Sequence, residues 1–183
     1  LKALVTEIKD AGGQAEYIVT DVTKKEQVMK MAQFAAEKFN RIDILVNNSG
    51  IMPLAFLSDH EQALDHWEAC IDTNFKGTLF GIVAVYDQMI KQGGGHIINV
   101  ASIYANLPVP GGAVYGATKA AMAFMTNAFR SETKGKINFT VIRPTGSNTN
   151  LAASVINMEA AAGCLGSNYG YAVKVGGEMQ QGT

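Results

Sequence analysis

Tyr115 and Lys119 are the first residues of this 183-residue sequence whose types and spacing suggest chemistry. They lie four positions apart at the start of a predicted helix, so they share one helix face. A phenol with a pKa of about 10 exchanges protons poorly at neutral pH, and a nearby ammonium lowers that pKa by favouring the phenolate. Such a tyrosine can act as a general acid or base. Two exposed side chains on a surface helix would give the same pattern, so other residues must decide.

Ser102 is the residue that favours chemistry at this pair. It ends a predicted strand thirteen positions before Tyr115, and a loop rich in proline and glycine joins the two. This loop can fold the Ser102 hydroxyl back towards the start of the helix. A hydroxyl in that place can hold a substrate carbonyl by a hydrogen bond while Tyr115 delivers the proton.

Composition limits the kinds of partner. The chain is 48% hydrophobic and 17% charged, with 15 basic and 16 acidic residues, which predicts one soluble domain with a core. A formal net charge of -1 gives no electrostatic basis for binding nucleic acid or an anionic membrane. No apolar stretch approaches the roughly 18 residues of a membrane span, and the charged start is unlike a signal peptide, so we expect a cytoplasmic protein.

Metal and disulfide chemistry find no support in the cysteines and histidines. Cys70 and Cys164 lie far apart without a Cys-x-x-Cys pattern, and we interpret both as packing residues. His60 and His66 do not share a helix face, and His96 opens a predicted strand. We therefore expect no metal site.

Hydrophobic periodicity predicts helices that alternate with short β-branched strands. Helices are expected at residues 1–11, 24–39, 58–92 (two stretches that join near Asn74 and Gly77) and 113–134, and strands at 16–20, 42–46, 96–100, 138–142 and 170–177. This order is typical of a doubly wound parallel α/β sheet of the Rossmann type. The strand at 42–46 is apolar on both faces, which predicts a place in the middle of the sheet.

Polar residues gather where the predicted strands end. Ligands of open parallel sheets bind outside the carboxyl ends of the strands, so these residues are candidates for binding. They are Asp21, Asn47, Asn48, Ser49, Gly50, Ser102, Pro144 and Thr149. The alternative for each residue alone is that it only turns the chain.

Taken together, these residues resemble the short-chain dehydrogenase/reductase family. The resemblance spans about residues 12 to 150 in order. It rests on Asp21-Val22 after a strand, Asn47-Asn48-Ser49-Gly50 where the family usually has Asn-Asn-Ala-Gly, Asn74 within a helix, the stretch from His96 to Ser102, Tyr115-Gly-Ala-Thr-Lys119, Arg143-Pro144 and Thr149. The ordered set is far more specific than any of its parts.

The resemblance implies catalytic roles for four residues. Tyr115 would be the acid/base, Lys119 would lower its pKa and bind the nicotinamide ribose, and Ser102 would orient the carbonyl. Asn74 would hold a water in a proton relay through Lys119. The alternative for Asn74 is a bond to nearby backbone, as asparagines in helices often make.

The resemblance also implies a nicotinamide cofactor, NADP or NAD, and a small ketone, aldehyde or secondary alcohol as substrate. The residues expected to bind the cofactor are Asp21, Val22, Asn47, Ser49, Gly50, Tyr115, Lys119, Pro144 and Thr149. Packing of the helices that hold Asn74 and Tyr115 against symmetry mates would give a homodimer or homotetramer. Two alternatives are a 3-oxoacyl-thioester reductase and a catalytically silent fragment that acts as a binding or assembly module.

The sequence departs from the family pattern in three places. No glycine-rich turn for a pyrophosphate is found, so we expect a single NAD(P)-binding domain over residues 1–183 that is incomplete at its N-terminus. Pro144-Thr145-Gly146-Ser147 differs from the usual Pro-Gly segment. Residues 151–169 are expected to be a variable region near the substrate, and they do not indicate its class.

Overall fold

The computed structural model describes residues 1–145 and 150–166. Thr149 and the strand predicted at 170–177 lie outside the described residues. The elements in chain order are α1 (Lys2–Asp10), α2 (Lys25–Phe39), β1 (Ile44–Asn47), η1 (Leu57–Asp59), α3 (His60–Cys70), η2 (Ile71–Lys76), α4 (Gly77–Lys91), β2 (Gly95–Val100), η3 (Ile103–Ala105), α5 (Ala113–Thr133), β3 (Ile137–Ile142), η4 (Asn150–Ser154) and α6 (Met158–Leu165).

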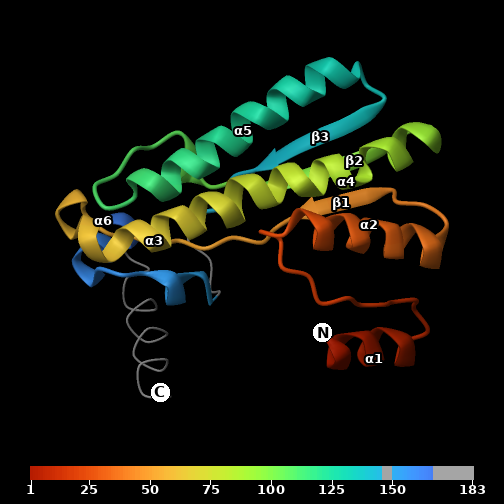
Figure 1. The fold of residues 1–183 in the computed structure, drawn as a ribbon, viewed down its shortest axis with the longest axis horizontal. Helices are drawn as coiled ribbons and strands as arrows, with labels where there is room; N and C mark the ends of the chain where they lie inside the picture. Colours follow the sequence, from red (N-terminus) through yellow and green to blue (C-terminus); the bar gives the residue numbers. More distant parts are fainter. Residues whose placement is uncertain (146–149, 167–183) are drawn as a thin grey trace.

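The three strands form a parallel sheet in the order β1-β2-β3 (Figure 1). Asn47 pairs with Asn99 in one ladder, and Val100 pairs with Ile142 in the other. This register brings the carboxyl ends of all three strands to one edge of the sheet. The predicted parallel sheet with flanking helices is confirmed, and the loops that follow each strand are thereby placed side by side.

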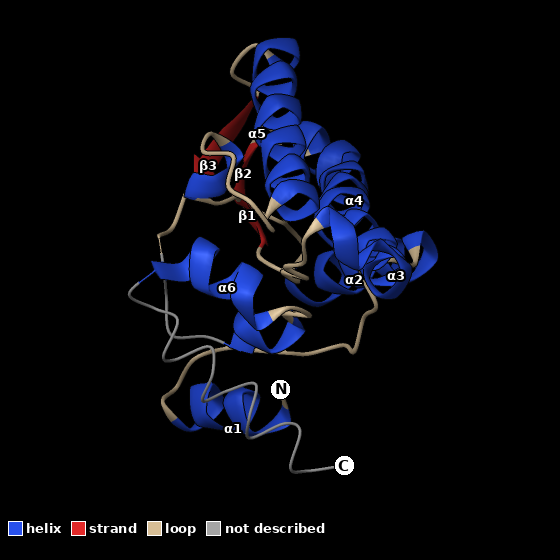
Figure 2. Cartoon of the chain, turned by 90° about the vertical axis from the view of Figure 1, so that its left-hand side faces the viewer, coloured by secondary structure: helices blue, strands red, loops and turns tan. Residues whose placement is uncertain are grey.

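Helices α2, α4 and α5 lie on one side of the sheet, with α2 packed on α4 and with α4 and α5 packed on the strands (Figure 2). Met125 and Phe129 of α5 pack against a hydrophobic core whose buried members, from α2, α4, β2 and β3, are Ala32, Ile82, Val85, Met89, Ile97, Ile137 and Phe139. Alternate strand residues such as Ile97 and Asn99 face these helices and are fully buried. The core therefore fixes where α4 and α5 begin relative to the strand ends.

Two strand predictions are wrong for the described structure. Residues 14–20 form no strand, and Val19 is 79% exposed. β1 stands at an edge of the sheet rather than in its middle, with Ile44 60% and Val46 53% exposed. Both results have one cause, because a strand needs a hydrogen-bonded neighbour, and among the described residues none lies beside 14–20 or on the outer side of β1.

Helices α3 and α4 form one long rod that is interrupted by η2, a turn of π-helix. The sequence predicts a join near Asn74 and Gly77, and both residues lie at this turn. Single π turns are wider than the α-helix and often mark functional sites. The extra width lets Asn74, which is fully buried, reach across to neighbouring segments.

Among the described helices, none is long and apolar enough to cross a membrane.

Candidate active site

A cavity of about 600 Å³ opens at the carboxyl ends of the strands. It is lined by Asn48, Gly50, Ile51, Val100, Ala101, Ser102, Tyr115, Lys119, Pro144, Thr145, Asn150, Leu151, Ala153 and Ser154. Six of the residues predicted from sequence thus meet in one place: Asn48, Gly50, Ser102, Tyr115, Lys119 and Pro144. They come from the loops after β1, β2 and β3 and from the first turns of α5.

Ser102 and Tyr115 line the same cavity, and Ser102 is close enough to Tyr115 to influence its pKa. Ser102 follows β2 in extended backbone, and its Oγ accepts a hydrogen bond from the backbone N–H of Tyr104 at 3.2 Å. Tyr115 lies in the first turn of α5, and both side chains are nearly inaccessible, with 6% and 4% of their surfaces exposed. The loop between them therefore folds back as the sequence predicts.

Burial decides the ionisation of Tyr115. Removal of the phenol from water raises the pKa of Tyr115, and the hydrogen bond with Ser102 opposes that rise. The ammonium of Lys119 lies 5.8 Å from the centre of the phenol ring. The expected lowering of the Tyr115 pKa by Lys119 is thus not the net result here, because desolvation of the phenolate is the larger effect.

Lys119 is a buried cation at the inner wall of the cavity, with 4% of its surface exposed. Its Nζ donates a hydrogen bond to the backbone carbonyl of Val100 at 2.8 Å. Burial lowers the pKa of Lys119 from 10.5 to about 8. An ammonium has three donors, so a group in the cavity can accept from the other two.

Asn74 is tied to the loop after β1 by a pair of hydrogen bonds. Its Oδ1 accepts from the backbone N–H of Ile51 at 2.9 Å, and its Nδ2 donates to the Ile51 carbonyl at 2.9 Å. The same Nδ2 lies 3.1 Å from Thr118 Oγ1, one residue before Lys119. The side chain of Asn74 therefore bonds to backbone that is distant in sequence, rather than to the nearby backbone of the alternative interpretation.

Gly50 leaves a space beside these two residues. A Cβ at position 50 would lie 3.2 Å from Asn74 Oδ1 and 3.4 Å from Lys119 Nζ. Such contacts are tighter than ordinary van der Waals packing. A side chain here would therefore press on Asn74 and Lys119, whereas glycine keeps the loop close to both.

Four predicted cofactor-binding residues do not line the cavity. Asn47 donates through Nδ2 to Asn99 Oδ1 at 2.7 Å, on the face of the sheet that the helices cover. The Asp21 carboxylate accepts from the backbone and hydroxyl of Thr23, which lowers the pKa of Asp21. Val22 packs against Gly77, where a Cβ would lie 3.0 Å from Val22 Cγ2, and the fourth residue, Ser49, is absent from the lining.

Two parts of the lining were not assigned to the cofactor from the sequence. Asn48 lines the cavity, and the sequence names it only as one of the polar binding candidates where the strands end. Asn150, Leu151, Ala153 and Ser154 form the second part, where the sequence predicts only a variable region near the substrate at 151–169. Ser154 fixes this part, because its Oγ accepts from Met52 N–H at 2.7 Å. No periodicity or motif in that segment announces this contact.

Comparison with known sequences places the chain in a family. The sequence profile of the short chain dehydrogenase family matches residues 1–160. An uncharacterized oxidoreductase of Listeria innocua is 39% identical over 166 residues, which are 89% of this chain and 66% of the relative. One of Staphylococcus saprophyticus is 43% identical over 135 residues, 72% of this chain and 54% of the relative.

Solved structures show the same fold. A short-chain dehydrogenase/reductase from Burkholderia phymatum, in complex with NAD, superposes with a TM-score of 0.79 at 26% identity, over 84% of this chain and 56% of the other. A gluconate 5-dehydrogenase from Burkholderia cenocepacia, in complex with NADP and tartrate, gives 0.72 at 32% identity, over 82% and 60%.

The protein belongs to the short-chain dehydrogenase family, as the resemblance of its motifs predicts. The chain spans between about half and two thirds of the length of the relatives named above.

The burial of Lys119 leads to a prediction about stability. Lys119→Met removes a cation that is costly to bury, and the lost hydrogen bond to Val100 offsets part of the gain. We expect the variant to raise the free energy of unfolding at pH 7 by about 1 to 2 kcal/mol. Urea unfolding of both proteins measures this difference.

The advantage of Lys119→Met should shrink as pH rises. Between pH 8 and pH 10.5 the unfolded lysine binds more protons than the folded one, so the wild type gains stability relative to the variant. Suppose instead that the variant is less stable than the wild type at pH 7 and that the difference in unfolding free energy stays constant up to pH 10. That result would contradict a lowered pKa of Lys119 in the folded protein.

Proposed function

We propose that the protein is an NAD(P)-dependent oxidoreductase with Tyr115 as general acid/base. It would transfer a hydride between the cofactor and a small ketone or aldehyde, or in reverse from a secondary alcohol. The observation that carries the proposal is that Ser102, Tyr115 and the buried ammonium of Lys119 line one cavity. We further propose that the protein is cytoplasmic and that residues 1–183 belong to one domain.

The residues of the cavity fit the nicotinamide end of such a cofactor. Lys119 offers two ammonium donors that could bind ribose hydroxyls. Gly50 keeps the loop after β1 clear of this point, and Asn48 and Thr145 add polar groups to the wall. Relatives of known structure hold NAD or NADP, which supports either cofactor for this chain.

The chemistry that a reduced nicotinamide would supply is a hydride for the carbonyl carbon. Ser102 Oγ accepts from the N–H of Tyr104, and its O–H is the group that would donate to the carbonyl oxygen. Tyr115 gives its proton to that oxygen, and Lys119 stabilises the phenolate that remains. Because burial keeps Tyr115 protonated, the site is suited to reduction, while oxidation of an alcohol requires the proton to move the other way.

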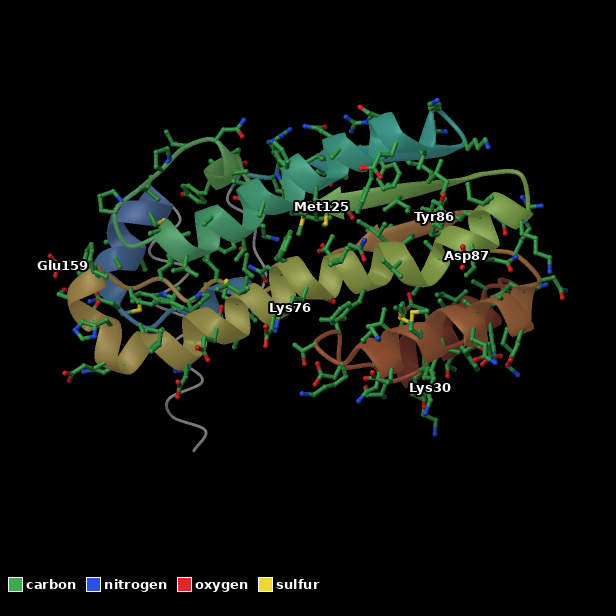
Figure 3. All side chains as sticks on the ribbon, turned by 45° about the horizontal axis from the view of Figure 1, so that its top comes forward. Lys30, Lys76, Tyr86, Asp87, Met125 and Glu159 are labelled. Carbon is green, nitrogen blue, oxygen red and sulfur yellow. The ribbon has the colours of Figure 1, made fainter. Side chains whose placement is uncertain are left out.

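We also propose that helices α4 and α5 form a contact between two copies of the chain. A groove of about 370 Å³ between them is lined by Asp87, Glu132, Thr133 and a majority of apolar residues, which include Val83, 51% exposed, and Tyr86, 43% exposed. Figure 3 labels Tyr86 and Asp87, which lie in the second half of α4, and Phe129 and Glu132 of α5 line the same groove. Exposed apolar side chains along two adjacent helices favour a homodimer or homotetramer.

Replacement of Tyr115 by phenylalanine tests the proposed chemistry. Tyr115→Phe keeps the ring and removes the proton donor, so carbonyl reduction should fall by at least about 100-fold. Nicotinamide fluorescence should still report cofactor binding. Tyr17→Phe, at a tyrosine 42% exposed, is the matched control and should keep full activity.

Full reductase activity in Tyr115→Phe would refute the mechanism. A panel that contains free ketones and acyl-carrier thioesters distinguishes the proposed substrates from those of a 3-oxoacyl-thioester reductase. If the folded wild type binds neither NADH nor NADPH and reduces none of the substrates in the panel, a silent binding module would be favoured.

The proposed contact between copies predicts the effect of a charge in the groove. Val83→Glu places a carboxylate near Asp87 and Glu132, so we expect self-association to weaken by about tenfold or more. Sedimentation velocity measures it, with Lys30→Glu on α2 as the charge-changing control (Figure 3). Assembly that is unchanged in Val83→Glu would exclude this surface as the contact.

A further inference from the structure

Tyr104 contacts three separate parts of the site. It lies in η3, the turn that follows Ser102, and its backbone N–H donates to Ser102 Oγ. Its ring packs edge-on against the ring of Tyr115, with the centroids 6.4 Å apart and the planes at 65°. Its hydroxyl donates to the backbone carbonyl of Cys164 in α6.

The bond to Cys164 has a physical reason. The last four carbonyls of a helix have no partner within that helix, and Cys164 is the penultimate residue of α6. The Tyr104 hydroxyl satisfies one of these carbonyls. This contact joins α6 to the loop that carries Ser102, although 60 residues separate the two partners.

Helix α6 is held at its other end as well. Asn157 accepts from the backbone of Glu159 and Ala160 at the start of the helix, and its Nδ2 donates to Asp59 Oδ2 at 2.8 Å. Glu159 marks this end of α6 in Figure 3, near the start of α3. The helix is thus hydrogen-bonded at both ends, and the bond at Tyr104 is the one that leads to the loop that carries Ser102.

The loop before α5 is shaped to receive α6. A Cβ on Gly111 would lie 2.5 Å from Ala160 Cβ, and a Cβ on Gly112 would lie 3.1 Å from Cys164 Sγ. Gly111 also has a φ of +77°, which side chains disfavour. Residues 150–154, just before α6, line the cavity. A shift of α6 would therefore change the wall of the cavity.

We propose that Tyr104 is a positioning residue that couples α6 to the pair Ser102–Tyr115. The position of residues 150–166 at the cavity and the orientation of Ser102 and Tyr115 then depend on each other. This inference rests on the proposed function for its catalytic meaning. Tyr104 does not line the cavity, so it acts through Ser102, through Tyr115 and through α6.

Each contact has a distinct consequence. The N–H of Tyr104 occupies one lone pair of Ser102 Oγ and so directs the Ser102 proton elsewhere. The ring of Tyr104 packs against one side of Tyr115, whose pKa is raised mainly by burial. The hydroxyl of Tyr104 fixes α6. Phenylalanine at position 104 removes only the last contact, and leucine also removes the ring.

The chain contains two cysteines, and the reactivity of one of them, Cys164, measures how firmly α6 is held, while the other, Cys70, serves as an internal control. Cys164 lies in α6 and is 5% exposed, whereas Cys70 lies in α3 and is fully buried. In Tyr104→Phe we expect dithionitrobenzoate to label Cys164 roughly five times faster, because a hydrogen bond that closes α6 is lost. Labelling of Cys70 should not change. Tyr17→Phe is the matched control and should leave both rates at the wild-type values.

Titration of Tyr115 tests the second half of the proposal. Carbon-13 tyrosine NMR, with the Tyr115 signal assigned by its loss in Tyr115→Phe, should show a lower Tyr115 pKa in Tyr104→Leu. Tyr104→Phe should leave it unchanged. In an active enzyme the alkaline fall of carbonyl reduction should move to lower pH in Tyr104→Leu alone, because reduction needs the protonated phenol.

Asn157→Ala separates positioning from a merely structural role. It frees the other end of α6, so Cys164 labelling should rise and KM should increase while the Tyr115 titration stays at the wild-type pKa. Unchanged Cys164 labelling in Tyr104→Phe, or an unchanged Tyr115 titration in folded Tyr104→Leu, would overturn the proposal. Neither readout needs turnover, so a wild type without reductase activity refutes the proposed function and still leaves the coupling decided.

Discussion

The buried amide of Asn74 is the contact on which the geometry of the site depends. It is fully buried and bonds to both backbone groups of Ile51 and to Thr118. Loss of these partners would leave polar groups buried and unpaired, at a cost of about 1 to 3 kcal/mol for each group. The wide turn of η2, the loop after β1 and the start of α5 are therefore held together, and this arrangement brings Gly50 and Lys119 to one cavity.

Desolvation sets the protonation of Lys119 and Tyr115, the two titratable groups of this site. Burial disfavours the ammonium of Lys119 and the phenolate of Tyr115, so the pKa of the first falls and that of the second rises. Tyr115 consequently keeps its proton, and a protonated tyrosine is the state that the proposed carbonyl reduction requires. A charge that develops on Tyr115 during reduction would meet the ammonium of Lys119 in a region of low polarity, where their attraction is strong.

Local pattern in the sequence is enough to predict much of the fold and the centre of the site. Helix α5 matches its predicted range at 113–134 within one residue, because its start follows a proline-glycine loop and its face is regularly apolar. The strand expected at 16–20 fails because pairing depends on a neighbour that local sequence does not contain. Asn47 shows the same limit, since its amide bonds to Asn99 rather than facing the cavity. The contact of Ser154 with Met52 spans 102 residues and leaves no local pattern.

The central claim is that the cavity around Lys119 binds a nicotinamide cofactor. The most direct test is a fluorescence titration of the protein with NADPH and NADH in parallel, alongside Lys119→Met. The account predicts saturable binding of at least one cofactor to the wild type and affinity weakened by about tenfold in the variant, since two charged hydrogen-bond donors are lost. A folded wild type that binds neither cofactor, or a variant that binds as tightly as the wild type, would contradict it.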